Sequence, residues 1–194
     1  METNIDTLGA DILGITAFAG FWIIFFIFMF FIFAVCVVGY LLQAISLFKM
    51  AKSTNNDLAW LAWIPIANMY LMITIPKQPF NMLGGKIHFD DRNSAAMMYF
   101  IYTILGSTIF SMVSGVLLFI PILGELLDFL LYICFIVFAY LMLYSISKDL
   151  FDTFAPEKNN SMMAILGLFI PFVRVIYMFT LRNNVAQEKV IIVE

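Results

Sequence analysis

The longest uncharged run of the chain, residues 12–48, places the strongest constraint on what the protein can fold into. It contains no Asp, Glu, Lys or Arg over 37 residues. A helix of that length is about 55 Å long, whereas the hydrocarbon core of a bilayer is about 30 Å thick. The run therefore predicts a membrane-spanning helix of which part lies outside the core. We place the span at residues 21–48 and expect residues 1–20 to form an interfacial lead-in that Gly20 separates from it.

The composition of the chain also indicates a membrane protein. Of its 194 residues, 63% are hydrophobic and 12% are charged, whereas a soluble domain has about 45–50% apolar and about 25% charged residues. A soluble domain of this size has too little interior to bury the 22 Phe and 13 Met residues. The net charge of −3 provides no basic surface for nucleic acid. We therefore expect a lipid bilayer as the main partner and exclude nucleic acid.

Two further apolar runs, residues 95–119 and 126–147, are long enough to span a membrane. The short sequence IPILGE joins them. Glu125 and Asp128 lie in the first turn of the later run, where the helix dipole favours negative charge. These runs predict an all-α fold, in which residues 1–194 form one polytopic helical bundle with three full spans.

Two shorter apolar stretches, residues 58–75 and 161–181, look like copies of each other. Each contains a proline, a strongly polar residue three positions later and a tyrosine five or six positions later. The matching positions are Pro65 and Pro171, Asn68 and Arg174, and Tyr70 and Tyr177. Each stretch also follows a span that ends near a lysine. The repeated unit of span, basic link and interrupted apolar segment is a pattern that transporters also show.

The basic residues distinguish two topologies. If all five stretches cross the membrane, Lys and Arg divide almost evenly between its two sides and predict no orientation. If the two proline stretches return to the side from which they enter, all ten basic residues lie on one side, as the positive-inside bias predicts. We expect this second topology, with the N-terminus outside and the C-terminus in the cytoplasm. The chain then divides into the lead-in 1–20, the first span with its proline segment 21–80, a cytoplasmic loop 81–94, the remaining spans with the second proline segment 95–184, and a cytoplasmic tail 185–194.

Pro65 and Pro171 mark the apices of these two predicted re-entrant hairpins. Non-helical backbone at membrane depth is tolerated only where protein or water satisfies its polar groups, so the three spans must shield each apex. Asn68 and Arg174 would lie just past the deepest point and cap unpaired carbonyl groups. The alternative is that each stretch is a short span kinked at its proline.

Three polar side chains within apolar segments are candidates for a functional role. A charge at membrane depth costs about 3 kcal/mol, so Arg174 should face the protein interior, a vestibule or a lipid phosphate, unless it reaches the headgroups or caps the Pro171 break. Asn68 and Gln43 either bridge neighbouring helices through their amides or line a polar vestibule with Arg174.

Small residues recur at every fourth position of the second span: Thr103, Ser107, Ser111 and Gly115. On a helix they share one face, which allows another helix to approach closely. We expect this stripe to be a helix contact. A conducting polar lining is the alternative.

The remaining reactive side chains do not form a catalytic pattern. His88 is the only histidine, and Asp90 and Asp91 beside it make a metal site conceivable, but a solvated loop is the simpler interpretation. Cys36 and Cys134 lie within apolar runs, where a cysteine behaves as a small hydrophobe. Known catalytic and nucleotide-binding motifs are absent from the sequence. We expect neither an enzyme nor a metal or other cofactor.

The stretch from LFKMAK through LAWLAWIPIANMY to PKQPF resembles an uncharacterised family of small prokaryotic integral membrane proteins. The matching positions are Phe48, Lys49, Ala51, Lys52, Trp60 or Trp63, Ile64, Pro65, Ile66, Asn68, Tyr70, Lys77, Pro79 and Phe80. The chain departs from the pattern at Met50 and Ala67, where the family tends to have lysine and tyrosine. The resemblance implies a prokaryotic cytoplasmic membrane and no particular activity.

These features predict a non-enzymatic membrane protein that serves as an accessory or scaffold subunit and contacts a partner membrane protein or a second copy of itself. One alternative is a small channel, carrier or insertase-like protein, with Asn68 and Arg174 lining a vestibule open to the cytoplasm. Another is an immunity protein against a membrane-active peptide.

Overall fold

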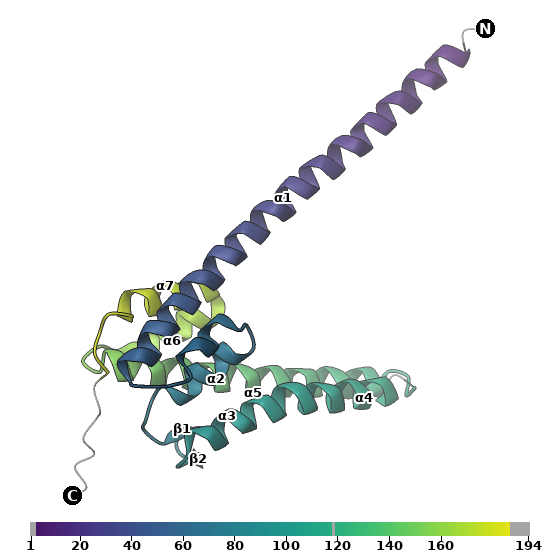
Figure 1. Ribbon diagram of the computed structural model, residues 1–194. Coiled ribbons are helices and arrows are strands. Elements are labelled where there is room, and N and C mark those ends of the chain that lie inside the picture. Colours follow the sequence, from purple (N-terminus) through teal and green to yellow (C-terminus); the bar gives the residue numbers. More distant parts are fainter. Residues whose placement is uncertain (1–2, 118, 187–194) are drawn as a thin grey trace, which may run out of the picture. The chain divides into compact units, whose positions relative to one another are not determined.

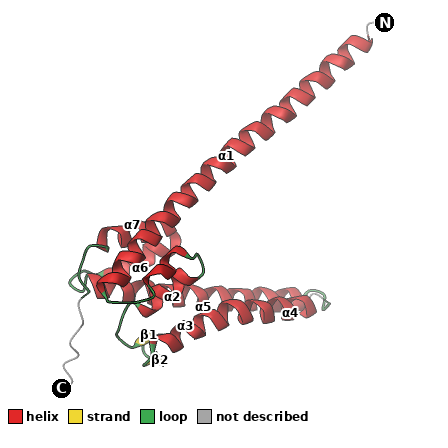
Figure 2. Ribbon diagram, in the orientation of Figure 1, coloured by secondary structure: helices red, strands yellow, loops and turns green. Residues whose placement is uncertain are grey.

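The computed structural model describes residues 3–117 and 119–186, which are almost entirely helical (Figures 1 and 2). The predicted all-α fold is confirmed. By its internal contacts the chain divides into two units, residues 1–41 and 42–194. Three described helical segments are long and apolar enough to cross a membrane, Phe18–Ser53, Arg92–Leu117 and Leu123–Phe154, so the protein is a membrane protein.

The first unit consists of helix α1, which runs from Thr3 to Ser53 and continues into the second unit after Leu41. The predicted break at Gly20 is wrong, because α1 passes through this residue without interruption. A glycine inside a helix costs only about 1 kcal/mol relative to alanine, and the apolar residues on both sides continue the helix. Nearly every described side chain from Phe18 to Val38 is exposed, as expected for a helix whose surroundings are lipid.

The second unit contains the remaining elements. Two of them are short: η1 is a 3-10 helix and η2 is a single π-helical turn. In chain order the elements are η1 (Ala59–Trp63), α2 (Ala67–Thr74), β1 (Phe80–Met82), β2 (Ile87–Phe89), α3 (Arg92–Ile101), η2 (Tyr102–Gly106), α4 (Ser107–Leu117), α5 (Leu123–Phe154), α6 (Asn160–Phe169) and α7 (Pro171–Leu181). Strands β1 and β2 form an antiparallel pair. The turn between them contains Gly84 and Gly85, both of which have positive φ.

Segments α3, η2 and α4 form one continuous helical arm that packs antiparallel to α5. The arm starts at Arg92 because Asp91 caps it, accepting hydrogen bonds from the backbone amides of Asn93 and Ser94. Tyr102 stacks on Phe135 with ring centroids 4.8 Å apart. The predicted span 126–147 is too short at its C-terminal end, since α5 continues to Phe154.

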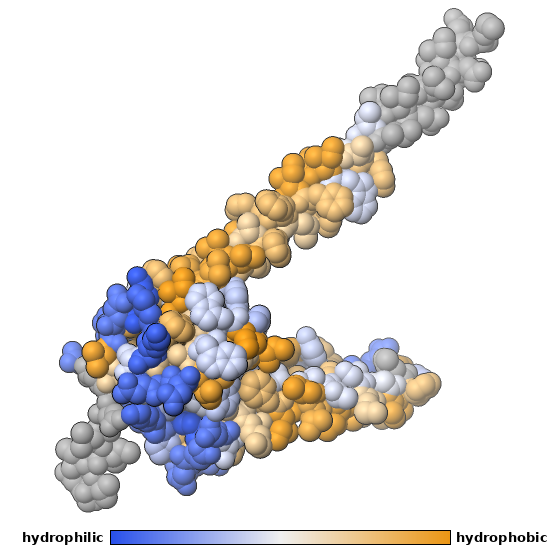
Figure 3. Space-filling model, in the orientation of Figure 1, coloured by the Kyte–Doolittle hydropathy of each residue, from blue (hydrophilic) through white to orange (hydrophobic). Residues whose placement is uncertain are grey.

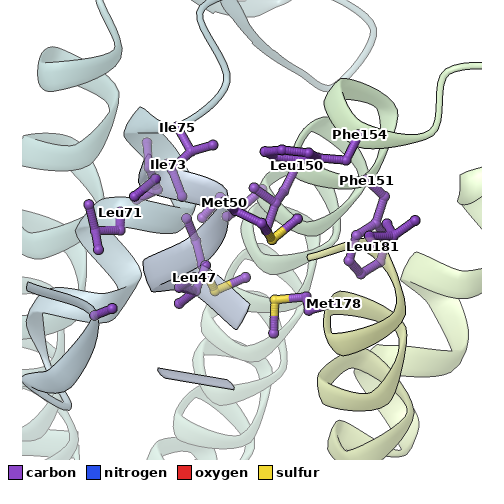
Figure 4. Close-up of a cluster of buried hydrophobic side chains, with 14 of the residues drawn as sticks. Leu47, Met50, Leu71, Ile73, Ile75, Leu150, Phe151, Phe154, Met178 and Leu181 are labelled. Carbon is purple, nitrogen blue, oxygen red and sulfur yellow. The ribbon is translucent and has the colours of Figure 1, made fainter. Parts of the chain in front are cut away.

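The core of the second unit lies around the last turns of α5. Buried side chains from α1, α2, α5 and α7 meet there, as Figure 4 shows. They include Leu47, Met50, Leu71, Ile73, Ile75, Leu150, Phe151, Phe154, Met178 and Leu181. Burial of each large apolar side chain contributes about 1.5–3 kcal/mol. By contrast, at most 6% of the apolar window of any candidate span is buried, so lipid or another protein must cover the spans.

The second proline stretch forms an antiparallel helical hairpin. The Tyr177 hydroxyl donates to the Asn160 Oδ1 atom over 2.7 Å, which joins the start of α6 to the middle of α7. Gly167 lies against Arg174, close to the corner at Pro171. Residues of α6 and α7 up to 17 positions apart in the sequence are therefore in contact, which a single kinked helix would not allow.

The first proline stretch is also broken at its proline. Its two helical pieces, η1 and α2, contain 5 and 8 residues, so they are each about 10–12 Å long. Neither piece could cross the hydrocarbon core of a bilayer.

Candidate functional site

The sequence did not single out Arg92 and Asp149, but their side chains form a buried ion pair in the second unit. The Arg92 Nη2 atom lies 3.0 Å from the Asp149 Oδ2 atom, and the two side chains are 8% and 24% exposed. Arg92 also donates to the backbone carbonyls of Gln78, Ile73 and Pro79. One buried guanidinium thus joins α3 and α5 to the link that follows α2.

The position of this pair follows from the antiparallel packing. Arg92 begins the α3–α4 arm and Asp149 lies in the last two turns of α5, so both residues reach the same end of the helix pair. In the sequence, Arg92 precedes the second apolar run and Asp149 follows the third. These opposite charges indicate an ion pair only if the two runs are known to pack side by side.

A polar cavity of about 440 Å³ lies beside Arg92. Its walls include the turn after α1, the end of α2 and the start of α3, and they carry Thr54, Asn55, Asn56, Asp57, Tyr70, Thr74, Lys77 and Asn93. A smaller cavity of about 140 Å³ adjoins the same turn and is lined by Ser53, Gln78 and Thr153 among others. Neither cavity is lined by Asn68, Arg174 or Gln43.

Arg174 lies in α7, where its side chain packs against Gly167 of α6. A Cβ atom on Gly167 would come within 2.8 Å of the Arg174 Cβ atom, so only glycine allows this approach of the two helices. The Nε and Nη1 atoms of Arg174 are buried and have no hydrogen-bond partner in the described part of the chain. They therefore do not cap carbonyl groups at the Pro171 break, as the sequence had suggested.

The charge of Arg174 is only weakly compensated. Arg174 takes part in none of the ion pairs of the described residues, although the side chain of Tyr99 in α3 is close enough to interact with it electrostatically. An arginine stays protonated in a protein. A buried cation whose donors are unpaired costs several kcal/mol.

An apolar cavity of about 320 Å³ lies near this arginine. Its walls come from α3 and η2, from α5, and from both helices of the α6–α7 hairpin. The lining residues are Tyr99, Tyr102, Thr103, Ala139, Tyr140, Met142, Leu143, Leu168 and Pro171. Tyr99 thus belongs both to the cavity wall and to the surroundings of Arg174.

The other two polar candidates lie apart from Arg174 along the chain and serve different contacts. The Gln43 amide in α1 donates to the Met72 sulfur in α2 over 3.8 Å, so it bridges two helices. Asn68 is 5% exposed and lies in the first turn of α2. The three side chains line none of the three cavities described above, so these cavities offer no common vestibule for them.

The small-residue stripe is not used for packing within the described chain. Thr103, Ser107, Ser111 and Gly115 are all exposed, and no atom lies within 4 Å of a Cβ built on Gly115. The α4 helix contacts α5 through another face, on which Phe110 stacks on Phe135. The hydroxyls of Thr103 and Ser107 donate to carbonyls of their own helical arm.

The described residues give no support for a metal site at His88. Its ring nitrogens contact Asn81 and Asp90 in the exposed β1–β2 loop, while Asp91 caps α3. Over residues 3–117 and 119–186, no three His, Cys, Asp or Glu side chains gather as metal ligands. Cys36 and Cys134 are free and exposed on their helices.

Comparison of the chain with protein-family models, with curated proteins and with solved structures finds no match.

Proposed function

We propose that the protein is a non-enzymatic subunit of a membrane complex and contacts a partner membrane protein, or a second copy of itself, through the small-residue stripe of α4. The observation that carries this proposal is that the stripe is exposed while α4 packs on α5 through a different face. Small side chains on a lipid-facing helix give little packing with lipid but permit close approach of a second helix.

The state of the stripe hydroxyls also supports a contact surface. Thr103 and Ser107 each donate to a carbonyl of the preceding turn, so these two donors need no partner outside the helical arm. Another helix can therefore approach these hydroxyls without leaving their donors unpaired.

The proposal includes an arrangement in the membrane. Both proline stretches expose apolar residues on either side of the proline: Ile64 and Ile66 around Pro65, and Phe169, Ile170 and Phe172 around Pro171. Exposed apolar corners on short broken helices fit partial immersion in a bilayer. Trp60 and Trp63 are also exposed, and tryptophan favours the membrane interface.

The basic residues give the orientation in this proposal. The described basic residues, from Lys49 to Arg182, all belong to the second unit. Hydrophilic residues gather at the end of this unit that contains the buried core, which we call the core end (Figure 3). Asp128 near one end of α5 and Lys148 near the other are separated by about 30 Å of helix, one hydrocarbon thickness. With the positive-inside rule, the core end faces the cytoplasm of a prokaryotic cell and the N-terminus lies outside.

Site-specific photocrosslinking in cells tests the partner contact. A photoreactive amino acid in place of Ser111 should give one discrete crosslinked product, which mass spectrometry identifies. The same amino acid in place of Ile109, which is 59% exposed and lies about 200° around the helix, is the matched control and should give none. Equal crosslinking at both positions, or only lipid adducts at Ser111, would contradict the proposal.

A further inference from the structure

We propose that the apolar cavity between the α3–α4 arm, α5 and the α6–α7 hairpin binds one acyl chain of an anionic phospholipid whose phosphate pairs with Arg174. The cavity shares only Thr103 with the small-residue stripe, and the inference does not rest on the proposed function. It combines two observations. The cavity has mostly apolar walls, and beside it lies Arg174, which has unpaired donor atoms and interacts with the wall residue Tyr99.

The chemistry of the cavity fits an acyl chain. Ala139, Met142 and Leu143 from α5 and Leu168 and Pro171 from the hairpin are apolar wall residues. The Tyr102 hydroxyl, which could otherwise attract a polar ligand, donates to the Phe135 carbonyl over 2.5 Å. A cavity of about 320 Å³ with such walls favours an apolar occupant.

The chemistry beside the cavity fits an anionic headgroup. Two nitrogens of Arg174 are buried without a hydrogen-bond acceptor among residues 3–117 and 119–186. The ion pairs of the described residues do not include Arg174. A phosphate supplies both the missing charge and acceptors, and arginine binds phosphate oxygens through paired donors.

The position of Arg174 agrees with a lipid ligand. Tyr99 lies seven residues after Arg92 in α3, which is about 10 Å along the helix. Arg92 marks the end of the span at which the basic residues gather. A cation at about this depth lies close to the level of the phospholipid phosphates.

The fixed position of Arg174 makes the site selective. Its Cβ atom lies against Gly167 and its Nε and Nη1 atoms are buried, so the guanidinium is held at the hairpin. A guanidinium that is already positioned loses less conformational entropy when it binds. Preference for an anionic headgroup should therefore exceed what a mobile surface lysine would give.

Native mass spectrometry of the purified full chain in mild detergent tests the site. The probes are dioleoyl phosphatidylglycerol and dioleoyl phosphatidylcholine, which differ only in the headgroup. We expect one phosphatidylglycerol to bind at least tenfold more tightly than phosphatidylcholine. Glycerol phosphate, which lacks the chains, should not compete at equal concentration. Equal affinity for the two lipids, or full competition by glycerol phosphate, would overturn the proposal.

Matched variants separate the two parts of the site. Arg174→Gln should abolish the preference for phosphatidylglycerol, whereas Arg182→Gln, about two helix turns further along, should leave it within twofold of wild type. Ala139→Phe fills the cavity and should weaken phosphatidylglycerol binding at least fivefold. Val137→Phe, on an exposed part of α5, should not.

Each variant result has a definite meaning once circular dichroism shows wild-type helicity. A loss of preference in Arg182→Gln equal to that in Arg174→Gln would indicate general attraction to basic residues and overturn the site. Unchanged binding by Ala139→Phe would overturn the acyl-chain assignment. If Arg174→Gln does not fold, the wild-type lipid comparison and Ala139→Phe still decide the proposal.

Discussion

At the scale of single residues, three polar side chains of the second unit stand out. Two of them connect its helices, and the third has buried donor atoms without hydrogen-bond partners among the described residues. Arg92 is fully engaged by Asp149 and backbone carbonyls. Asn160 bonds to Asp152, Ala155 and Tyr177 and so joins α5, α6 and α7. Arg174 alone keeps two buried donors without a partner among the described residues. The first two side chains have structural roles, and the third is the candidate for a ligand.

The Arg92–Asp149 pair gives a prediction for stability. Asp149→Asn should lower the free energy of unfolding by about 3–5 kcal/mol, because it leaves the buried Arg92 charge uncompensated. Lys148→Gln removes an ion pair to Asp152 whose lysine is 37% exposed, so it should cost only about 0–1 kcal/mol. Thermal or denaturant unfolding in detergent micelles measures both. Equal effects of the two changes would show that the buried pair has no special role.

At the scale of elements, the three spans follow from the sequence, while the boundaries and the broken segments need tertiary information. Long apolar runs suffice to predict α1, the α3–α4 arm and α5. The π-helical turn at Tyr102–Gly106 has no signature in the apolar pattern. The unbroken course of α1 through Gly20 shows that one glycine is a weak stop signal when its neighbours favour helix.

The candidate site was less predictable than the fold. The sequence identified Arg174 because a lone cation in an apolar run stands out. It could not place Tyr99, Ala139 and Leu168 around one cavity, since these residues belong to elements that meet only after folding. Asn160 was missed for the same reason, as its partners lie at the end of α5 and in α7.

The hairpin of α6 and α7 gives a prediction at this scale. Spin labels at Asn159 and Thr180, both exposed, should show an interspin distance about 10–15 Å plus the label linkers, since packed helices lie about 8–10 Å apart. A continuous or mildly kinked helix would separate the two positions by about 31 Å. Double electron-electron resonance in nanodiscs measures the distance. A major population near the longer value would contradict the hairpin.

At the scale of the whole molecule, two environments stabilise different parts of the chain. The buried core at the end of α5 has its own packing, whereas the apolar faces of the spans remain exposed and require lipid or protein around them. The described basic residues belong to the second unit, and its core includes residues of both proline segments. The account therefore depends on both proline segments starting and ending on the cytoplasmic side.

Sided cysteine labelling tests this central claim most directly. In a chain with Cys36 and Cys134 replaced by alanine, single cysteines are placed on either side of each proline segment: Asp57 and Lys86, and Glu157 and Gln187. All four should react with a membrane-impermeant maleimide only after the cytoplasmic face is exposed, whereas a cysteine at Thr7 should react from outside in intact cells. Labelling of Asp57 and Lys86, or of Glu157 and Gln187, from opposite faces would show that a proline segment crosses the membrane and would contradict the account.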